Sequence, residues 1–496
     1  MSVQDDIKGV YPCNEQGISI VDNVGSNALW CCSRNSANNA WYVNANNGNV
    51  NTNNSSNRYR VLFSVELLSS IANDVLDAEE RCYKNKHCSK DAAQIHYHLS
   101  KLINIIKSLS NNTWKPSKSI RFVVTYPCYR EIYCSNYLDR VVHHLVAPLL
   151  VEVAEYAHSK AGNVSHGNRT GFSAQTAAEQ IRSNIYKVSE GYTKPCYIMT
   201  YDISGFFMNI DRNKAFDTFM KYYNEMPKLS SRNDTFTISL LESIIKDDAT
   251  NNAEKHSPDW LLEKIPINKR LKSDKGLPIG RYPSQLIANL FISDVNEALK
   301  HIEGLYHTQF VDDSCNISDN IATLWKGYNL AKQMYAEKGL IIHPKKLYIQ
   351  PATHGVSFCG RVIKMQRIYI SNRTVGACYN TIRKLSTNPC LETAKKLCRS
   401  INSYFGLFSH CSAYNIQVKL ANRILKDFGE WLYFKKRKAQ LICKLKTKYK
   451  NTYQSIVDYN NILDYYETCE IKRRRTHSCN VSREYRWRRK SKKRRI

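Results

Sequence analysis

The 496-residue chain is short of acidic side chains relative to basic ones. It has 43 Asp and Glu against 72 Lys and Arg, which gives a formal net charge of +29. Such an excess implies an anionic partner and an affinity that falls with salt, because binding neutralises phosphates and releases their counterions. Nucleic acid satisfies both conditions, although a basic ribosome-associated protein would show the same balance.

Seventeen cysteines are present, but the spacing of a zinc site is absent. No CxxC pair occurs, and the nearest exceptions are Cys31 with Cys32, and Cys82 with Cys88 beside His87. Zinc ligands usually come in close Cys or His pairs, so these scattered cysteines indicate reduced cytosolic thiols.

Long apolar segments are also absent. No uninterrupted run reaches the roughly 18 apolar residues of a membrane-spanning helix. The opening MSVQDDIKGV is acidic and polar, unlike a signal peptide. We therefore expect a soluble, cytoplasmic protein with no membrane partner.

Three aspartates dominate what is present: Asp202 in YDISGFFMNID, and the adjacent Asp312 and Asp313 in HTQFVDDSCN. The apolar CYIM before Asp202 predicts a buried strand that ends at the aspartate and turns tightly through Gly205. The residues around the acidic pair predict two antiparallel strands whose hairpin carries the carboxylates at its tip. An isolated Asp-Asp pair would more often be an ordinary surface turn.

Nucleotide polymerisation requires carboxylates from separate strands to meet. Two divalent ions about 3.5 to 4 Å apart clamp the attacking and leaving oxygens, and Mg²⁺ needs one or two carboxylates besides substrate phosphates. Asp202 and Asp312 meet this requirement. GLPIGRYPSQL lies between them and predicts the start of a helix over residues 285–300, with Ser284 as its N-cap. Together these elements indicate a nucleic acid polymerase.

On these motifs, residues 90 to 440 resemble reverse transcriptases, including the group II intron and retron types, and within them the enzymes of diversity-generating retroelements. Most reverse transcriptases carry QGxxxSP in the middle motif, whereas the retroelement family is recognised by an aliphatic residue followed by GxxxSQ. This chain has Ile279, Gly280, Ser284 and Gln285 there.

Upstream segments also carry the resemblance. TYPCYREI, NYLDRVVHHLVAPLL and GNRTGFSAQTAA resemble the family's first fingers motif, its following helix and its Gly-containing fingers segment. Two positions depart from the family's pattern. Cys128 stands where a lysine often follows the proline, and Phe310 replaces the usual tyrosine before the Asp-Asp pair while keeping an aromatic ring.

The resemblance implies an α+β, right-hand polymerase fold with an antiparallel palm sheet and a helical thumb. We place fingers and palm at 63–372, a basic helical thumb at 373–470 and a basic tail at 471–496. Within 472–495, thirteen Lys or Arg against one acid predict a disordered arm that binds phosphates, with a nuclear localisation signal as the alternative. Helical periodicity from 64 to 110 and a β-hairpin in SIRFVVTYPCYREIYCS complete the expected fingers.

Residues 1–62 form an Asn-rich leader, with thirteen asparagines between Asp22 and Asn57. The composition predicts loop or low complexity, and a disordered polar leader is one interpretation. The succession W, NAWYV, NGNV and YRV also resembles the variable end of the C-type lectin-fold proteins that these retroelements diversify. The second interpretation is a segment derived from the element's own template repeat, because asparagine codons begin with two adenines and this family miscopies adenine.

The site residues implied by the resemblance fall into five groups. Catalysis is assigned to Asp202, Asp312, Asp313 and Lys346; metal binding to Asp202, Ile203, Asp312 and Asp313; nucleotide binding to Arg130, Ser204, Gly205, Phe206, Phe207 and Gln285; fidelity or template contact to Ile279, Gly280, Ser284, Gln285 and Arg169; and the primer grip to Phe358, Cys359 and Gly360. The implied cofactors are two Mg²⁺ ions, for which Mn²⁺ can substitute.

Four of these assignments have competing interpretations. Arg130 would contact the triphosphate, or would be a solvated arginine on a strand. Lys346, in GLIIHPKK, would protonate the departing pyrophosphate, with Lys345 as the alternative. Phe207 would exclude a ribose 2′-hydroxyl, although either Phe206 or Phe207 could instead belong to the core. Ile279 would loosen discrimination opposite template adenine, or would serve packing alone.

The implied function is that of an RNA-directed DNA polymerase, bacterial or phage-encoded, which makes adenine-mutagenised cDNA from a template-repeat RNA. Its implied partners are template RNA and cDNA, deoxynucleoside triphosphates, and a basic, oligomeric accessory variability protein. A faithful reverse transcriptase of retron, group II intron or phage-defence type is the first alternative. A non-catalytic RNA-binding scaffold is the second, and a variable ligand-binding protein represented by the N-terminus is the third.

Overall fold

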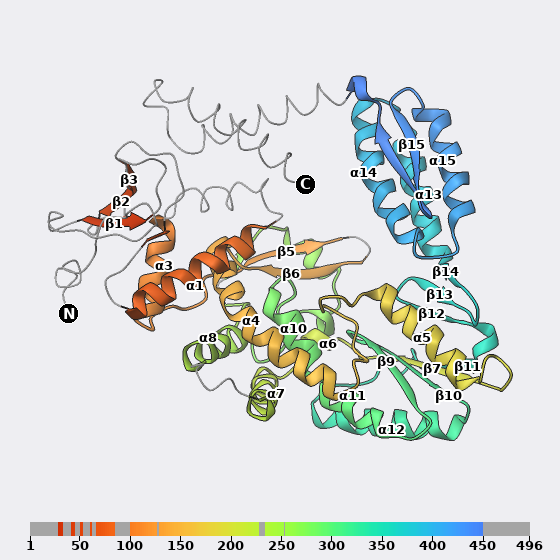
Figure 1. The fold of residues 1–496 in the computed structure, drawn as a ribbon, viewed down its shortest axis with the longest axis horizontal. Coiled ribbons are helices and arrows are strands. Elements are labelled where there is room, and N and C mark those ends of the chain that lie inside the picture. Colours follow the sequence, from red (N-terminus) through yellow and green to blue (C-terminus); the bar gives the residue numbers. More distant parts are fainter. Residues whose placement is uncertain are drawn as a thin grey trace.

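The computed structural model describes residues 28–32, 41–44, 50–52, 60–61, 66–84, 100–125, 128–227, 234–251 and 253–449. Within these residues the chain is α+β, and Figure 1 shows a body of helices and sheets with a C-terminal bundle above it. The largest hydrophobic core runs through the helices and sheet of the body, whereas residues from Ile370 onward have a core of their own.

A four-stranded antiparallel sheet lies in the body, in the order β11-β7-β10-β9. The strands are β7 (Tyr197–Asp202), β9 (Tyr306–Phe310), β10 (Asp313–Ser318) and β11 (Tyr348–Pro351). Successive side chains point to opposite faces, so Ile198 and Ile317 pack with α5 (Ala174–Val188) while Met199 and Tyr201 join the main core. The predicted buried strand and the predicted hairpin are both confirmed.

Eight long helices complete the body around this sheet. They are α1 (Glu66–Tyr83), α3 (Ser100–Ser110), α4 (Tyr137–Lys160), α7 (Arg212–Glu225), α8 (Thr235–Lys246), α10 (Tyr282–Phe291), α11 (Ser293–Lys300) and α12 (Ile321–Glu337). α4 is central and contacts α1, α7, α8 and α10. Its N-cap is Asn136, whose side chain accepts a hydrogen bond from the Asp139 amide at 2.8 Å. The helices predicted between 64 and 110 are confirmed over α1 and α3, whereas residues 85–99 lie outside the described residues.

The single helix predicted over residues 285–300 is two helices. α10 begins at Tyr282, and Ser284 lies inside its first turn, where it makes no capping hydrogen bond. The prediction of Ser284 as N-cap was wrong because Pro283 fits the first helical turn, where backbone amides have no partner in any case. The first helix ends at Phe291, and after Ile292 the second helix, α11, begins at Ser293.

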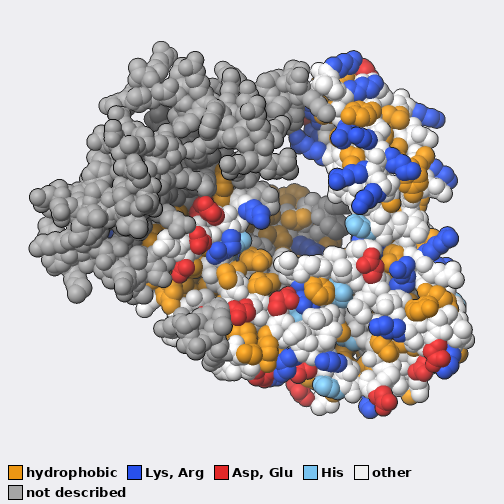
Figure 2. Space-filling model, in the orientation of Figure 1, with side chains coloured by type: hydrophobic (Ala, Val, Ile, Leu, Met, Phe, Trp, Pro, Cys, Tyr) orange, Lys and Arg blue, Asp and Glu red, His pale blue; other side chains and the backbone are white. Residues whose placement is uncertain are grey.

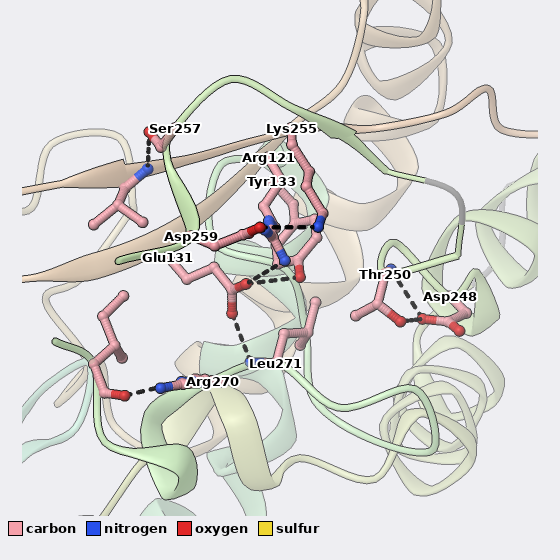
Figure 3. Close-up of polar contacts among 12 residues, drawn as sticks. Arg121, Glu131, Tyr133, Asp248, Thr250, Lys255, Ser257, Asp259, Arg270 and Leu271 are labelled. Atoms are coloured by element: carbon pink, nitrogen blue, oxygen red, sulfur yellow. Dashed lines mark hydrogen bonds and ion pairs between the residues drawn. The ribbon is translucent and has the colours of Figure 1, made fainter. Parts of the chain in front are cut away.

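A predicted β-hairpin and an unpredicted strap lie on the other side of the body. β5 (Ile120–Val124) and β6 (Arg130–Cys134) pair in antiparallel fashion, as expected. The strap is the segment 254–269. It contains β8 (Glu254–Lys255), which pairs in parallel with β5, and then α9 (Asp259–Glu263) and the 3₁₀ turn η2 (Ile267–Lys269). Figure 3 shows how it is fastened: Arg121 donates to Asp259 at 3.1 Å, and the Val123 amide donates to Ser257 at 3.0 Å.

The C-terminal bundle spans residues 372–445 and follows a small three-stranded sheet. The sheet is β12 (Val356–Phe358), β13 (Arg361–Ile363) and β14 (Ile368–Ile370), preceded by the 3₁₀ turn η3 (Ala352–His354); the bundle is α13 (Asn372–Leu385), α14 (Leu391–Phe408), α15 (Tyr414–Phe428), β15 (Leu432–Arg437) and β16 (Gln440–Leu445). Figure 2 shows Lys and Arg over the bundle, including beside the hollow between bundle and body.

The prediction of an entirely helical segment was wrong after Phe428. Apolar and polar residues alternate in LYFKKR and QLICKL, and this period of two favours strands. Lys438 has a positive φ of 52° at the turn between them. The hairpin packs its apolar face on α14 and α15 within the bundle's core.

Part of the Asn-rich leader has strand backbone where a loop was expected. β1 (Ala28–Cys32), β2 (Trp41–Asn44), β3 (Val50–Thr52) and β4 (Arg60–Val61) form an antiparallel sheet in the order β3-β2-β1-β4. Aromatic and aliphatic residues in ALWCC and WYVN favour strands and outweigh the surrounding asparagines. The remainder of 1–62 and the basic tail 471–496 lie outside the described residues. Among the helices that are described, none is long and apolar enough to cross a membrane.

Candidate active site

The sheet brings the three aspartates together. β7 and β10 are adjacent, and their register pairs Asp202 with Asp313. Asp312 lies at the tip of the hairpin, and its carbonyl accepts a hydrogen bond from the Ile203 amide at 3.3 Å. Two segments more than a hundred residues apart in the chain thus place their carboxylates at one edge of the sheet.

Burial and neighbouring carboxylates disfavour the ionisation of Asp312 and Asp313. Partial burial, Asp313 and Asp202 raise the pKa of Asp312 to about 7. Partial burial and Asp202 raise the pKa of Asp313 to about 6, although Lys346 opposes the shift. The Asp202 Oδ1 atom is buried and has no hydrogen-bond partner among the described residues. Neighbouring carboxylates that repel one another are stabilised by a cation between them.

These residues fit the Mg²⁺ ions that the resemblance implies. Mg²⁺ prefers oxygen ligands and keeps water or substrate phosphate in its remaining positions. The unpaired Asp202 Oδ1 and the two hairpin carboxylates supply such oxygens, beside the backbone of Ile203. No group of three acidic, His or Cys side chains forms a ready metal cage in the described part of the chain.

Lys346 reaches the aspartates. Its ammonium donates a hydrogen bond to Asp202 Oδ2, while about half of its side chain stays exposed. This hydrogen bond is the main cause that raises the pKa of Lys346, so the lysine carries a proton. Lys345 instead has its backbone amide bonded to the His343 ring at 3.2 Å. Of the two candidates, Lys346 is the one whose ammonium is bonded to an aspartate of the site.

The turn after Asp202 separates the two phenylalanines. Gly205 has a left-handed backbone (φ 56°) and opens the short helix α6 (Phe206–Asn209). The Ser204 amide is bonded to the Ile341 carbonyl at 2.8 Å, which fixes the start of the turn. Phe206 is 3% exposed and belongs to the core, whereas Phe207 is only partly buried.

Ile279 and Gly280 press against the β5–β6 hairpin. The Tyr133 amide donates to the Ile279 carbonyl at 2.8 Å, and the Ile279 side chain packs on Tyr133, Met208 and Leu271. Glu131 is buried beneath, where its carboxylate accepts from the Tyr133 hydroxyl at 2.9 Å and the Leu271 amide at 3.1 Å (Figure 3). The middle motif is thereby fastened to the hairpin and strap.

Gly280→Ala should destabilise this junction by roughly 1–3 kcal/mol, the usual cost of a strained backbone residue. Gly280 has φ +117°, and a Cβ there would lie 2.8 Å from the Tyr133 carbonyl oxygen. Thermal unfolding would measure the loss. Gly304→Ala is the control, because its φ of +73° is also strained but nothing lies within 4 Å of the added carbon. Equal losses in both variants would show that the contact with Tyr133 is unimportant.

The other predicted residues lie in varied settings. Ser284 is 6% exposed and Gln285 is partly buried, both in the first turns of α10. Arg130 is exposed, and its Nε donates to the Cys128 sulfur at 3.3 Å. Arg169 is used internally: its guanidinium makes two hydrogen bonds to the Glu155 carboxylate, at 2.9 and 2.6 Å, instead of reaching outward.

The predicted primer-grip turn lies beside the acidic pair. Cys359 and Gly360 have positive φ angles of 47° and 74° between β12 and β13, as a tight two-residue hairpin requires. Burial first, and then the charge of Asp313, raise the pKa of the Cys359 thiol to about 12. The turn that follows Phe358 is therefore close enough to Asp313 for the carboxylate charge to act on the Cys359 thiol.

Two structural arginines were missed by the sequence analysis. Arg281 is 2% exposed and is paired with Asp247 at 2.6 Å and Ser119 at 2.8 Å. Arg212 is 6% exposed and donates to backbone carbonyls of the loop that precedes the middle motif, including Gly276 at 2.9 Å. Arg281 directly follows Gly280 in the sequence, which was the only available signal for it, and no pattern singled out Arg212.

Comparison with known proteins gives one family match. The family described as reverse transcriptase (RNA-dependent DNA polymerase) matches residues 125–363, which include all three aspartates. No curated protein sequence matches the chain.

Solved structures similar to the chain include telomerases. Apo telomerase from Candida tropicalis, truncated from its C-terminal domain, has 12% identity and a TM-score of 0.41, covering 55% of this chain and 60% of that one. Telomerase from Candida albicans with a fragment of telomeric RNA has 10% identity and a TM-score of 0.38, covering 64% and 61%. The chain thus spans about three fifths of the length of these structures.

Proposed function

We propose that this chain, whose residues 125–363 form a reverse transcriptase domain, is the mutagenic RNA-directed DNA polymerase of a diversity-generating retroelement. The observation that carries polymerase activity is the meeting of Asp202, Asp312 and Asp313 at one edge of the sheet inside the matched region. The retroelement type is supported by the sequence IGRYPSQ around Gly280, which departs from the QGxxxSP of most reverse transcriptases.

The residues of the site suit nucleotidyl transfer. When bound, Mg²⁺ would be held by the three aspartates and would stabilise charge on the reacting oxygens. Lys346 holds a proton beside Asp202 and can give it to the leaving pyrophosphate, help that is typically worth roughly 10²- to 10⁴-fold. Phe207 excludes a ribose 2′-hydroxyl, and the turn at Cys359 supports the primer end.

The basic surface gives a place for the nucleic acid. Lys and Arg side chains are spread over the C-terminal bundle among other side chains, some of them beside the hollow between the bundle and the body (Figure 2). RNA duplexes are held mostly through backbone and shape, so a basic surface without base-reading elements suits a template-primer duplex. We include template RNA, cDNA and a basic accessory variability protein as partners in this proposal.

Ile279→Gln should lower the error frequency at template adenines, because it replaces an aliphatic side chain at the junction of hairpin and α10 with one that can hydrogen bond. Sequencing of cDNA made by both proteins would measure it. Ile279→Val is the matched control, since it preserves the apolar contact with Tyr133 and Leu271. An unchanged error spectrum in the Gln variant would leave Ile279 a packing role only.

To test the proposed function, the purified chain is mixed with the template RNA encoded next to its gene, the accessory protein, Mg²⁺ and four deoxynucleotides. The cDNA products are then sequenced. Errors concentrated at template adenines are the expected result. Faithful cDNA would refute the retroelement type while keeping the polymerase. Absence of cDNA, equal to that of an Asp312→Ala, Asp313→Ala double variant, would favour an RNA-binding scaffold.

A further inference from the structure

Val311 holds a strained position at the tip of the β9–β10 hairpin. Its φ is +57°, a left-handed backbone that is unusual for any residue but glycine and an outlier for a β-branched one. Asp312 and Asp313 follow directly, so the direction of both carboxylates depends on this conformation. Strained residues of this kind persist only where their surroundings hold them.

Two neighbours hold Val311 in place. The Gln309 side-chain amide donates from Nε2 to the Val311 carbonyl at 2.8 Å. On the other side, Gly167 is so close that a Cβ there would lie 2.6 Å from Val311 Cγ2. Asn289, on α10, donates to the Gly167 carbonyl at 2.6 Å and keeps that segment against the hairpin.

The Gln309 side chain is itself held by a buried polar ladder. Its Oε1 accepts from the Ser314 hydroxyl at 3.1 Å and lies 3.1 Å from His307 Nε2. His307 also contacts Asn316 at 2.6 Å and Asn296 at 3.0 Å. All five side chains are at most 4% exposed. The register places Ser314 opposite Gln309 and Asn316 opposite His307, so they are cross-strand pairs on one face.

The ladder sets which end of the Gln309 amide faces Val311. Burial lowers the pKa of His307, which leaves its ring neutral with one N–H. With that proton on Nε2, the ring donates toward Gln309 Oε1 and its Nδ1 accepts. Once the Asn316 amide is turned, its otherwise unpaired Nδ2 donates to His307 Nδ1, an assignment that hydrogen-bond networks decide. Gln309 Nε2 is then the end left for the Val311 carbonyl.

We propose that Gln309 is a positioning residue for the acidic pair: held by Ser314 and His307, it keeps Val311 in the left-handed conformation that directs Asp312 and Asp313 toward Asp202. The catalytic consequence rests on the proposed function, but the effect on the carboxylates does not. A buried amide costs free energy unless its polar atoms are hydrogen-bonded. The Gln309 amide nitrogen donates to the Val311 carbonyl, at the tip of the hairpin.

The test compares Gln309→Met with Gln417→Met. Gln417 is a matched control in the C-terminal bundle, fully buried, where its amide likewise donates to a backbone carbonyl, that of Ala439, at 3.1 Å. Mn²⁺ binding, followed by electron paramagnetic resonance, and primer extension are measured for both. Gln309→Met should weaken Mn²⁺ binding and kcat by roughly 10- to 100-fold, as loss of outer-shell partners does, with the nucleotide KM little changed. Gln417→Met should lower the melting temperature alone.

A second substitution separates positioning from stability. Asn adopts the left-handed conformation more readily than Val, so Val311→Asn placed in the Gln309→Met protein should recover Mn²⁺ affinity. The proposal is overturned if Gln309→Met binds Mn²⁺ as the wild type does, or if Val311→Asn recovers nothing. Mn²⁺ affinity tests the positioning role of Gln309 even if the wild type makes no cDNA. Absence of cDNA would count against the proposed function alone.

Discussion

Asp312→Asn should abolish primer extension, with a loss of ~10³-fold or more in kcat, while stabilising the protein. In the proposed mechanism the carboxylate would help to hold metal ions whose stabilisation of the transition state is worth several kcal/mol. It also repels Asp313 and Asp202, and its pKa is raised to about 7 in the fold. Functional sites commonly trade stability for activity in this way.

The gain in stability of Asp312→Asn depends on pH, because the pKa of Asp312 differs between the folded and unfolded states. The folded pKa of about 7 exceeds the value of about 3.9 for an ordinary aspartate. Between these values the folded state binds more protons than the unfolded state, so the stability of the wild type falls as pH rises through the window. Asn does not ionise. In metal-free buffer, Asp312→Asn should therefore melt higher than the wild type at pH 8, and by a smaller margin at pH 5.

Asp319→Asn is the matched control, because Asp319 is an exposed acid just beyond the far end of β10. It should leave both primer extension and its metal dependence unchanged. Retention of activity in Asp312→Asn would remove this residue from the metal site, and equal melting temperatures at both pH values would mean that the three acids do not repel one another.

Phe207→Ala should raise the incorporation of ribonucleotides relative to deoxyribonucleotides by roughly 10- to 200-fold, the range spanned by a steric contact in a binding pocket. Phe207 is the partly buried member of the pair, with its carbonyl fixed by the Leu277 amide at 2.7 Å. Single-nucleotide extension with each triphosphate would measure the ratio.

Phe206→Leu is the comparison, because Phe206 is in the core and its ring meets that of Phe207 edge-on at 5.5 Å. It should lower the melting temperature and leave sugar selection intact. If Phe206→Leu relaxes selection and Phe207→Ala does not, the two roles are exchanged.

The strands that carry the aspartates could be predicted because local pattern and fold agree there. CYIM before Asp202 is an apolar run that only a buried strand or helix accommodates, and Gly205 marks its end. The ladder behind Gln309 gave no such signal: His307 and Gln309 occupy every second position of β9, which is the pattern of a strand with a solvated face. Only the packing of α11 over that face buries them.

Long-range contacts explain the other failures. The strap from β8 to η2 forms because β5 offers it a free edge, which no local periodicity encodes. The guanidinium of Arg169 belongs to Glu155 through a contact between α4 and a later loop. The helix predicted after Phe428 became a hairpin because α14 and α15 provide an apolar surface for alternating residues.

A backbone hydrogen bond and the apolar residues of β14 join the C-terminal bundle to the body. Ser371, which caps α13, donates its amide to the Gly360 carbonyl at 3.1 Å. β14 contributes Ile368 to the body's sheet cluster and Ile370 to the bundle's core. The start of the bundle is therefore bonded directly to the turn that carries Cys359 and Gly360. In the proposed polymerase, a movement of the bundle would shift the turn that supports the primer end.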